Sequence, residues 1–176
     1  IIKRYTRSNT QKGLISDFVL CFHKLDNGNM LIGTSSGTVF YNKSTDSFQP
    51  WKNIRSLVRQ IYEDKKRTIW IITNDGVYRY LPKEDKVVRY TSDLSKSQGL
   101  GSNNGNSVYE DSRGRIWITT SNGFSRYDDQ TDSFNRITSE NGLPSNIIYR
   151  IVEDDEHFFW ISTANGLVKF DPETFV

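Results

Sequence analysis

The sequence is poor in cysteine and methionine, with one of each among 176 residues. A single cysteine, Cys21, excludes an internal disulfide and any zinc site built from a cysteine cluster. No apolar run approaches the roughly 18 to 20 residues that a membrane-spanning helix needs, and no segment has the pattern of a signal peptide. The sequence therefore predicts no membrane segment and no metal centre, and we expect no cofactor.

Charge of one sign is not concentrated anywhere along the chain. Its 23 basic and 21 acidic residues are interspersed and leave a formal net charge of +2. This balance offers no basic stripe for a phosphate backbone, so nucleic acid is not an expected partner.

Aromatic residues are plentiful, at 13% of the chain. They favour half-buried pleated sheets over a helical bundle.

A segment of about nine residues recurs four times. It covers residues 115–123, returns at 68–76 and 158–166, and returns more weakly at 29–37. Each copy ends in a glycine, and these glycines are 39, 47 and 43 residues apart. A period in this range indicates a repeat architecture, and its length fits one four-stranded β-propeller blade.

Each repeat also predicts the order of its strands. An apolar stretch such as 108–111 forms the first strand, and a short turn leads to the second strand, which carries the tryptophan. The third strand alternates in polarity, as at 124–127, and an outer strand such as 133–137 follows. The predicted fold class is therefore all-β, with about four propeller blades, each a four-stranded antiparallel sheet.

The repeat register also predicts the blade boundaries. Residues 1–12 are expected as the outer strand of a preceding blade, followed by blades at 13–50, 51–90, 91–137 and 138–176, the last incomplete. Ile1 to Tyr5 could pair into the fourth sheet and close the ring, or the blades could form an open arc. A chain that begins inside a repeat is expected to be a fragment, and its uncovered sheet faces predict self-association, such as a homodimer, unless Ile1 to Tyr5 closes the fourth blade.

Large side chains recur at fixed points of the repeat. A residue of this kind in every copy is expected between neighbouring blades, and this reading outweighs stacking on sugars. The predicted blade-packing residues are Trp70, Trp117 and Trp160 on the second strands, and Tyr80, Tyr127 and Phe170 on the third strands.

The sequence gives no positive support for catalysis. Paired acids occur three times, at 63–64, 110–111 and 153–154, whereas a catalytic pair occurs once. Carboxylates at these turns are expected to accept backbone N–H bonds. His23 and His157 are isolated, so neither a metal cluster nor a Ser-His-Asp arrangement can be assembled. No catalytic or metal-binding residue is predicted, and the chain is not expected to be an enzyme.

Departures from the repeat indicate a candidate ligand site. The connection into the second blade is short and carries Trp51, the one tryptophan outside the register. The connection into the third blade is long. Trp51 would offer a flat face to a sugar ring, while Asn53 and Arg55 would offer hydrogen bonds, and Asn103 and Asn104 would close the site. The rival interpretation is that Trp51 only covers the edge of a blade.

Short polar residues recur next to the same connections. They suit hydroxyl-rich ligands, and they suit plain turn chemistry better. They are Asp17, Ser56, Asn103 and Asn146 before the first strands, and Ser36, Asp75, Asn122 and Asn165 before the repeat glycines.

The fourth copy carries a recognisable set of motifs. These are Asn141-Gly-Leu-Pro-Ser-Asn146, Ile151-Val-Glu-Asp154, Phe159-Trp-Ile-Ser-Thr-Ala-Asn-Gly-Leu167 and Phe170-Asp-Pro172. With them the chain resembles the two-component regulator propeller repeat over nearly its whole length. The first copy departs from the pattern, with Leu25 in place of aspartate and Leu31 in place of tryptophan.

The resemblance implies a location and a role. In hybrid two-component regulators and histidine kinases such repeats form seven-bladed propellers in the periplasm, followed by an immunoglobulin-like domain, a membrane helix and kinase parts. It implies a fragment of such a propeller, with the remaining blades and downstream domains as partners, that senses an oligosaccharide. The alternatives are a scaffold for protein–protein interaction and a propeller lyase or glycosidase.

Overall fold

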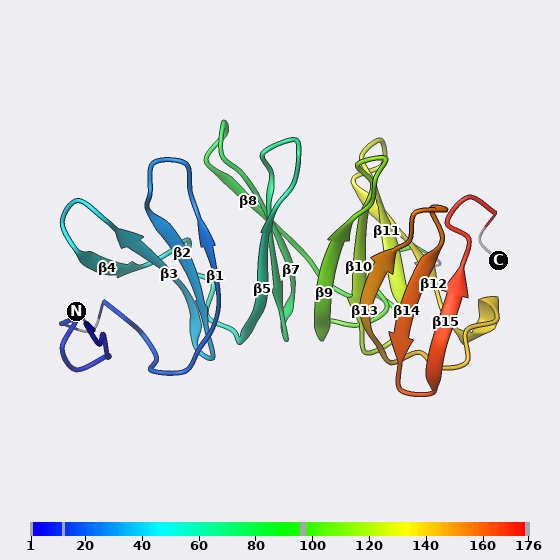
Figure 1. The fold of residues 1–176 in the computed structure, drawn as a ribbon, viewed down its shortest axis with the longest axis horizontal. Helices are drawn as coiled ribbons and strands as arrows, with labels where there is room; N and C mark the ends of the chain where they lie inside the picture. Colours follow the sequence, from blue (N-terminus) through cyan, green and yellow to red (C-terminus); the bar gives the residue numbers. More distant parts are fainter. Residues whose placement is uncertain (1, 12, 96–97, 175–176) are drawn as a thin grey trace.

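The computed structural model describes residues 2–11, 13–95 and 98–174. They form four antiparallel sheets arranged side by side in a row (Figure 1). Blade 1 holds β1 (Val19–Lys24), β2 (Met30–Thr34), β3 (Gly37–Asn42) and β4 (Ser47–Pro50). Blade 2 holds β5 (Val58–Glu63), β6 (Ile69–Thr73), β7 (Gly76–Leu81) and β8 (Lys86–Tyr90). Blade 3 holds β9 (Gly105–Glu110), β10 (Ile116–Thr120), β11 (Phe124–Asp128) and β12 (Ser133–Ile137).

Blade 4 holds β13 (Ile148–Glu153), β14 (Phe159–Thr163) and β15 (Gly166–Phe170). A single turn of 3₁₀ helix, η1 (Ser139–Asn141), precedes it. The sequence predicted an incomplete blade here, and within the described residues it has three strands. Residues 175–176 lie outside the described part. None of the described helical structure is long and apolar enough to cross a membrane.

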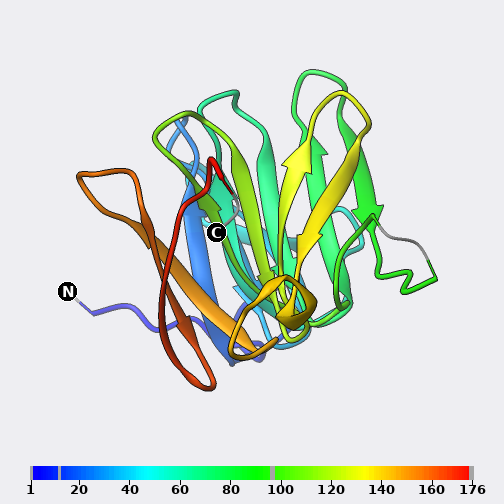
Figure 2. The ribbon, with the colours of Figure 1, turned by 90° about the vertical axis from the view of Figure 1, so that its right-hand side faces the viewer.

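The strands of each sheet are paired in chain order, and neighbouring sheets meet through their first strands. Contacts join β1 to β5, β5 to β9 and β9 to β13, while the outer strands β4, β8 and β12 face away (Figures 1 and 2). This is the arrangement of propeller blades around an axis, with the first strand innermost. The all-β propeller class is confirmed.

The turn between the first and second strands needs one residue with a left-handed backbone. Gly28 and Gly114 adopt φ angles of 82° and 76° there, which costs glycine little. Arg67 and His157 take the same place with φ of 69°. We call the side of the molecule with these turns the turn face. The opposite side, which carries the connections between blades, we call the connection face.

Two indoles lie between blades. Trp70 and Trp117 are 1% and 0% exposed. The Trp70 ring lies 5.0 Å from that of Tyr127, and the Trp117 ring 5.0 Å from that of Phe159, both in edge-to-face geometry. Each tryptophan thus packs against the blade that follows its own.

The expected burial of Trp160 is wrong, since this side chain is 39% exposed. Its equivalents in blades 2 and 3 are covered by the next blade, and no further blade follows blade 4 among the described residues. Phe170 and Tyr127 are buried, whereas Tyr80 is half-buried. An equivalent position in the sequence is therefore buried only where a neighbouring blade covers it.

The N-terminal segment does not close the ring. Residues 2–5 form no strand and lie against blade 1, at the opposite end of the row from blade 4 (Figure 1); Ile1 lies outside the described residues. The Tyr5 ring is 4.9 Å from that of Phe48, and its hydroxyl donates to Asp46. Tyr90, at the end of β8, makes the same pair of contacts to blade 3. Tyr5 thus takes the place of the last residue of an outer strand.

Candidate ligand-binding face

The side chain of Trp51 lies between blades 1 and 2. Its ring is half-buried and meets that of Tyr80 at 4.9 Å and 80°. It lines a pocket that opens toward the turn face, beside Asp26 and Arg67. The backbone N–H of Trp51 donates to Thr38 O of blade 1.

The other four predicted ligand residues form separate local pairs. Arg55 Nε donates to Asn53 Oδ1 at 2.8 Å, and Asn103 Oδ1 accepts from the Ser92 backbone N–H at 2.6 Å. Asn104 Oδ1 accepts from Arg59 Nη1 at 3.2 Å. Among the described residues, no hydrogen bond or ring contact joins Trp51 or Arg55 to Asn103 or Asn104. A shared ligand site for the five residues stays a prediction.

Most short polar residues beside the connections serve the backbone. Asp17 and Asn146 accept backbone N–H bonds at 2.6 Å from Arg7 and Ser139, as Asn103 does from Ser92. The amides of Asn122 and Asn165 donate to backbone carbonyls of the preceding connections. These side chains hold the blade connections in place.

A row of polar side chains lies on the first strands of blades 2 to 4 or, for Asn104, directly before one. Besides Arg59 and Asn104 it contains Asn106, whose amide donates to Ile148 O at 2.7 Å, and Arg150, whose Nη1 donates to Asn106 O at 2.9 Å. Tyr149 is 48% exposed. We call Arg59, Asn104, Asn106, Tyr149 and Arg150 the inner polar row.

The repeat register places most of this row. Arg59, Asn106 and Tyr149 are the second residues of β5, β9 and β13, so comparing first strands position by position would have found them. Blade 1 has Leu20 at this position, 49% exposed. At this position the residue thus changes from apolar in blade 1 to polar in blades 2 to 4.

The three glutamates of the acid pairs connect neighbouring blades. Glu63 Oε2 bonds His23 at 2.7 Å, Glu110 accepts from the Tyr62 hydroxyl at 2.9 Å, and Glu153 accepts from the Ser112 hydroxyl at 2.6 Å. Each bond crosses from one blade to the blade before it. The glutamates therefore link neighbouring blades near the turns between their first and second strands.

The three aspartates act within their own blade. Asp64, Asp111 and Asp154 each accept the indole N–H of the tryptophan six residues later, at 2.8, 2.9 and 2.8 Å. Each also accepts backbone N–H bonds of the first turn, which is the chemistry expected from the sequence. The indole bond was missed, although the constant spacing of Asp and Trp could have indicated it.

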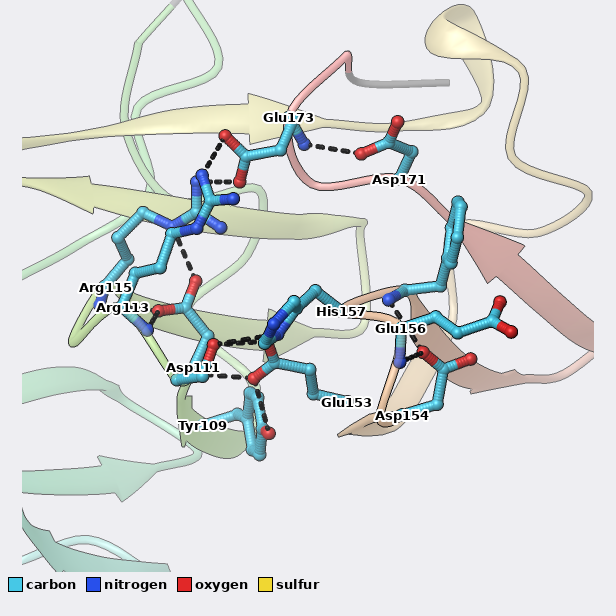
Figure 3. Close-up of polar contacts among 12 residues, drawn as sticks. Tyr109, Asp111, Arg113, Arg115, Glu153, Asp154, Glu156, His157, Asp171 and Glu173 are labelled. Carbon is cyan, nitrogen blue, oxygen red and sulfur yellow. Dashed lines mark hydrogen bonds and ion pairs between the residues drawn. The ribbon is translucent and has the colours of Figure 1, made fainter.

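One cluster superficially resembles a catalytic triad. Ser112 contacts both His157 and Glu153 between blades 3 and 4, and Figure 3 shows the last two side by side. Both the Ser112 hydroxyl, at 3.2 Å, and Glu153 Oε1, at 2.9 Å, contact the same imidazole nitrogen, Nδ1. A proton relay needs the acid and the nucleophile on different ring nitrogens. The cluster is therefore a variant of the blade-to-blade glutamate contact.

The electrostatics of this cluster agree with a structural role. Burial alone would raise the pKa of the Glu153 carboxyl, but hydrogen bonds from Ser112 and His157 outweigh it and hold this pKa below its usual range.

Burial raises the pKa of the Cys21 thiol to about 11. Among the described residues no group of three His, Cys, Asp or Glu side chains is placed to hold a metal ion.

Sequence comparison identifies the repeat. Residues 99–122 and 142–165 match the two-component regulator propeller family. The chain is thus similar to this family in two of its four repeats. Each match runs through the same part of its blade, from the Gly-Leu of the connection to the turn before the third strand, in blades 3 and 4. No curated protein matches the chain.

Solved structures share the fold at low identity. The extracellular domain of the hybrid two-component system BT3049 from B. thetaiotaomicron has a TM-score of 0.80 at 22% identity, over 98% of this chain and 24% of that one. That of the hybrid system BT4673 from the same organism has 0.80 at 20%, over 100% and 26%. Virginiamycin B lyase from Staphylococcus aureus has 0.60 at 14%, over 88% and 53%. The chain spans about a quarter of the length of the first two.

Proposed function

We propose that the chain is a ligand-sensing propeller segment of a two-component signalling protein and that it binds an oligosaccharide on the inner polar row without turning it over. The observation that carries the proposal is this row of arginine, asparagine and tyrosine side chains on a scaffold of two-component regulator propeller repeats. Binding residues are commonly presented in this way by a rigid repeat scaffold.

The chemistry of the row suits a sugar. Guanidinium and amide groups donate directional hydrogen bonds to hydroxyls, and a half-exposed tyrosine ring offers an apolar face. Two arginines, Arg59 and Arg150, favour an oligosaccharide with acidic substituents. The periplasm would expose this row to such a ligand, and further blades and downstream domains of a longer protein would receive the signal.

Binding is tested by calorimetry with neutral and acidic oligosaccharides. Arg150→Ala is expected to weaken binding of an acidic oligosaccharide about tenfold, the loss of one charge-assisted hydrogen bond. Arg150 is exposed, so the fold should be kept. Arg4→Ala, on the exposed N-terminal segment, is the matched control and should bind like the unchanged protein.

Arg55→Ala separates the inner polar row from the loop site predicted around Trp51. If Arg55→Ala abolishes binding and Arg150→Ala does not, the ligand lies on the connection into blade 2. Incubating the same oligosaccharides with the protein tests the absence of turnover. Release of shortened products would contradict the sensing role and favour a lyase or glycosidase.

A further inference from the structure

Blade 1 departs from the repeat at three linked positions. Where blade 2 has Asp64, Trp70 and Arg79, blade 1 has Leu25, Leu31 and Phe40. In blade 2 the indole N–H donates to Asp64, and the Arg79 guanidinium lies 5.7 Å from the Trp70 ring centroid. Asp64 also accepts the Thr68 backbone N–H at 2.8 Å, and Arg79 pairs with Asp132 of blade 3 at 3.1 Å. Blade 1 has neither the carboxylate nor the guanidinium, so no unpaired charge is left at these positions.

These apolar residues line a pocket between blades 1 and 2. Its volume is about 340 Å³. Its apolar wall is made by Leu25, Leu31, Phe40, Trp51, Ile69 and Tyr80. The corresponding pocket between blades 2 and 3 has about 280 Å³ and is lined by the ionic set, including Asp64, Arg79 and Arg115, with Trp70 itself as part of its wall.

Trp51 compensates for only part of the missing indole. It meets Tyr80 at 4.9 Å in edge-to-face geometry, as Trp70 meets the equivalent Tyr127 at 5.0 Å. Trp51 nevertheless stays half-buried and forms a side of the pocket. The three charged side chains at the pocket are bound to one another, because Arg67 pairs with Asp26 and, at 2.8 Å, with Glu63. A neutral ligand is therefore favoured.

We propose that the pocket between blades 1 and 2 binds a small, neutral, planar aromatic ligand about the size of an indole. The occupant follows from the repeat itself, since the same position in the next two interfaces is filled by an indole of the chain. Three aromatic walls can take such a ring edge-to-face. This site is independent of the inner polar row, which belongs to the innermost strands.

Methyl NMR of the chain with indole as the probe tests the proposal. The Ile69 methyl signals should shift in a saturable way. Those of Ile116, the equivalent residue of the next interface, should not shift, because the pocket there is lined by the charged side chains of Asp64, Arg79 and Arg115. Equal shifts at both isoleucines, or no saturable shift at Ile69, would overturn the proposal.

Filling the pocket gives a second test. The double variant Leu25→Asp/Leu31→Trp installs the aspartate–indole pair of blades 2 and 3 and should weaken indole binding at least tenfold. Leu167→Trp, on the exposed face of blade 4, is the matched control and should leave binding unchanged. Undiminished binding by a folded double variant would overturn the proposal. If that variant does not fold, the Ile69 and Ile116 comparison in the unchanged protein decides.

Discussion

The interface between blades 1 and 2 and the interface between blades 2 and 3 are built on the same backbone with different chemistry. Both keep the glutamate that crosses to the preceding blade, Glu63 in one and Glu110 in the other. Only the second has an aspartate–tryptophan hydrogen bond. The comparison shows that the glutamate contact can be present without the aspartate–tryptophan pair. In blade 1 both members of that pair are replaced.

The largest expected effect comes from the tryptophans. Trp117→Ala should destabilise the fold by about 3–5 kcal/mol, because it empties a fully buried site between two blades. Trp160→Ala removes the same side chain and the same bond to aspartate, but from a surface that is 39% exposed, and should cost about 1 kcal/mol. Urea unfolding measures both. Similar losses would mean that burial by the next blade is not what distinguishes them.

Converting blade 1 to the composition of blade 2 sharpens the comparison. Leu31→Trp alone places an indole N–H without its acceptor, and Leu25→Asp alone places a half-buried carboxylate without its donor. We expect the double variant to be about 1–3 kcal/mol more stable than the sum of the two single changes predicts. Thermal unfolding of the three variants gives this coupling, and strict additivity would contradict it.

Much of this comparison was accessible from the sequence. The repeat register predicted the order of the strands, and the departures Leu25 and Leu31 were visible in the first copy. The burial of Trp160 was predicted wrongly because burial depends on a neighbouring blade, which the pattern of one repeat does not contain. The position of the Trp51 ring was likewise inaccessible, since it depends on space that opens only when two blades pack.

Trp51 itself provides a smaller test. Trp51→Ala should lower stability by about 1–2 kcal/mol, because the half-buried ring packs on Tyr80 and covers the apolar interface. Melting temperature measured beside oligosaccharide affinity separates the two interpretations of this residue. Unchanged stability together with lost affinity would return Trp51 to the role of a sugar contact.

The glutamate contact that the interfaces share should be visible in the pH dependence. The lowered pKa of Glu153 contributes stability that is fully present above the unfolded value of about 4.3 and is lost as pH falls through the folded pKa. Glu153→Gln should therefore be less stable than the unchanged protein at pH 7, by about 1 kcal/mol. This difference in stability between the two proteins should shrink as the pH falls below about 4.3, as melting temperatures would show. A difference that does not vary with pH would contradict this origin.

A double-mutant cycle on Asp64→Leu and Trp70→Leu tests the account most directly, because it gives blade 2 two of the residues that blade 1 already has. If the aspartate and the tryptophan form one unit, losing the second partner should cost less once the first is gone. The two free energies of unfolding should then be non-additive by about 1–3 kcal/mol. A coupling of zero within error would contradict the claim that the pair is exchanged as a whole.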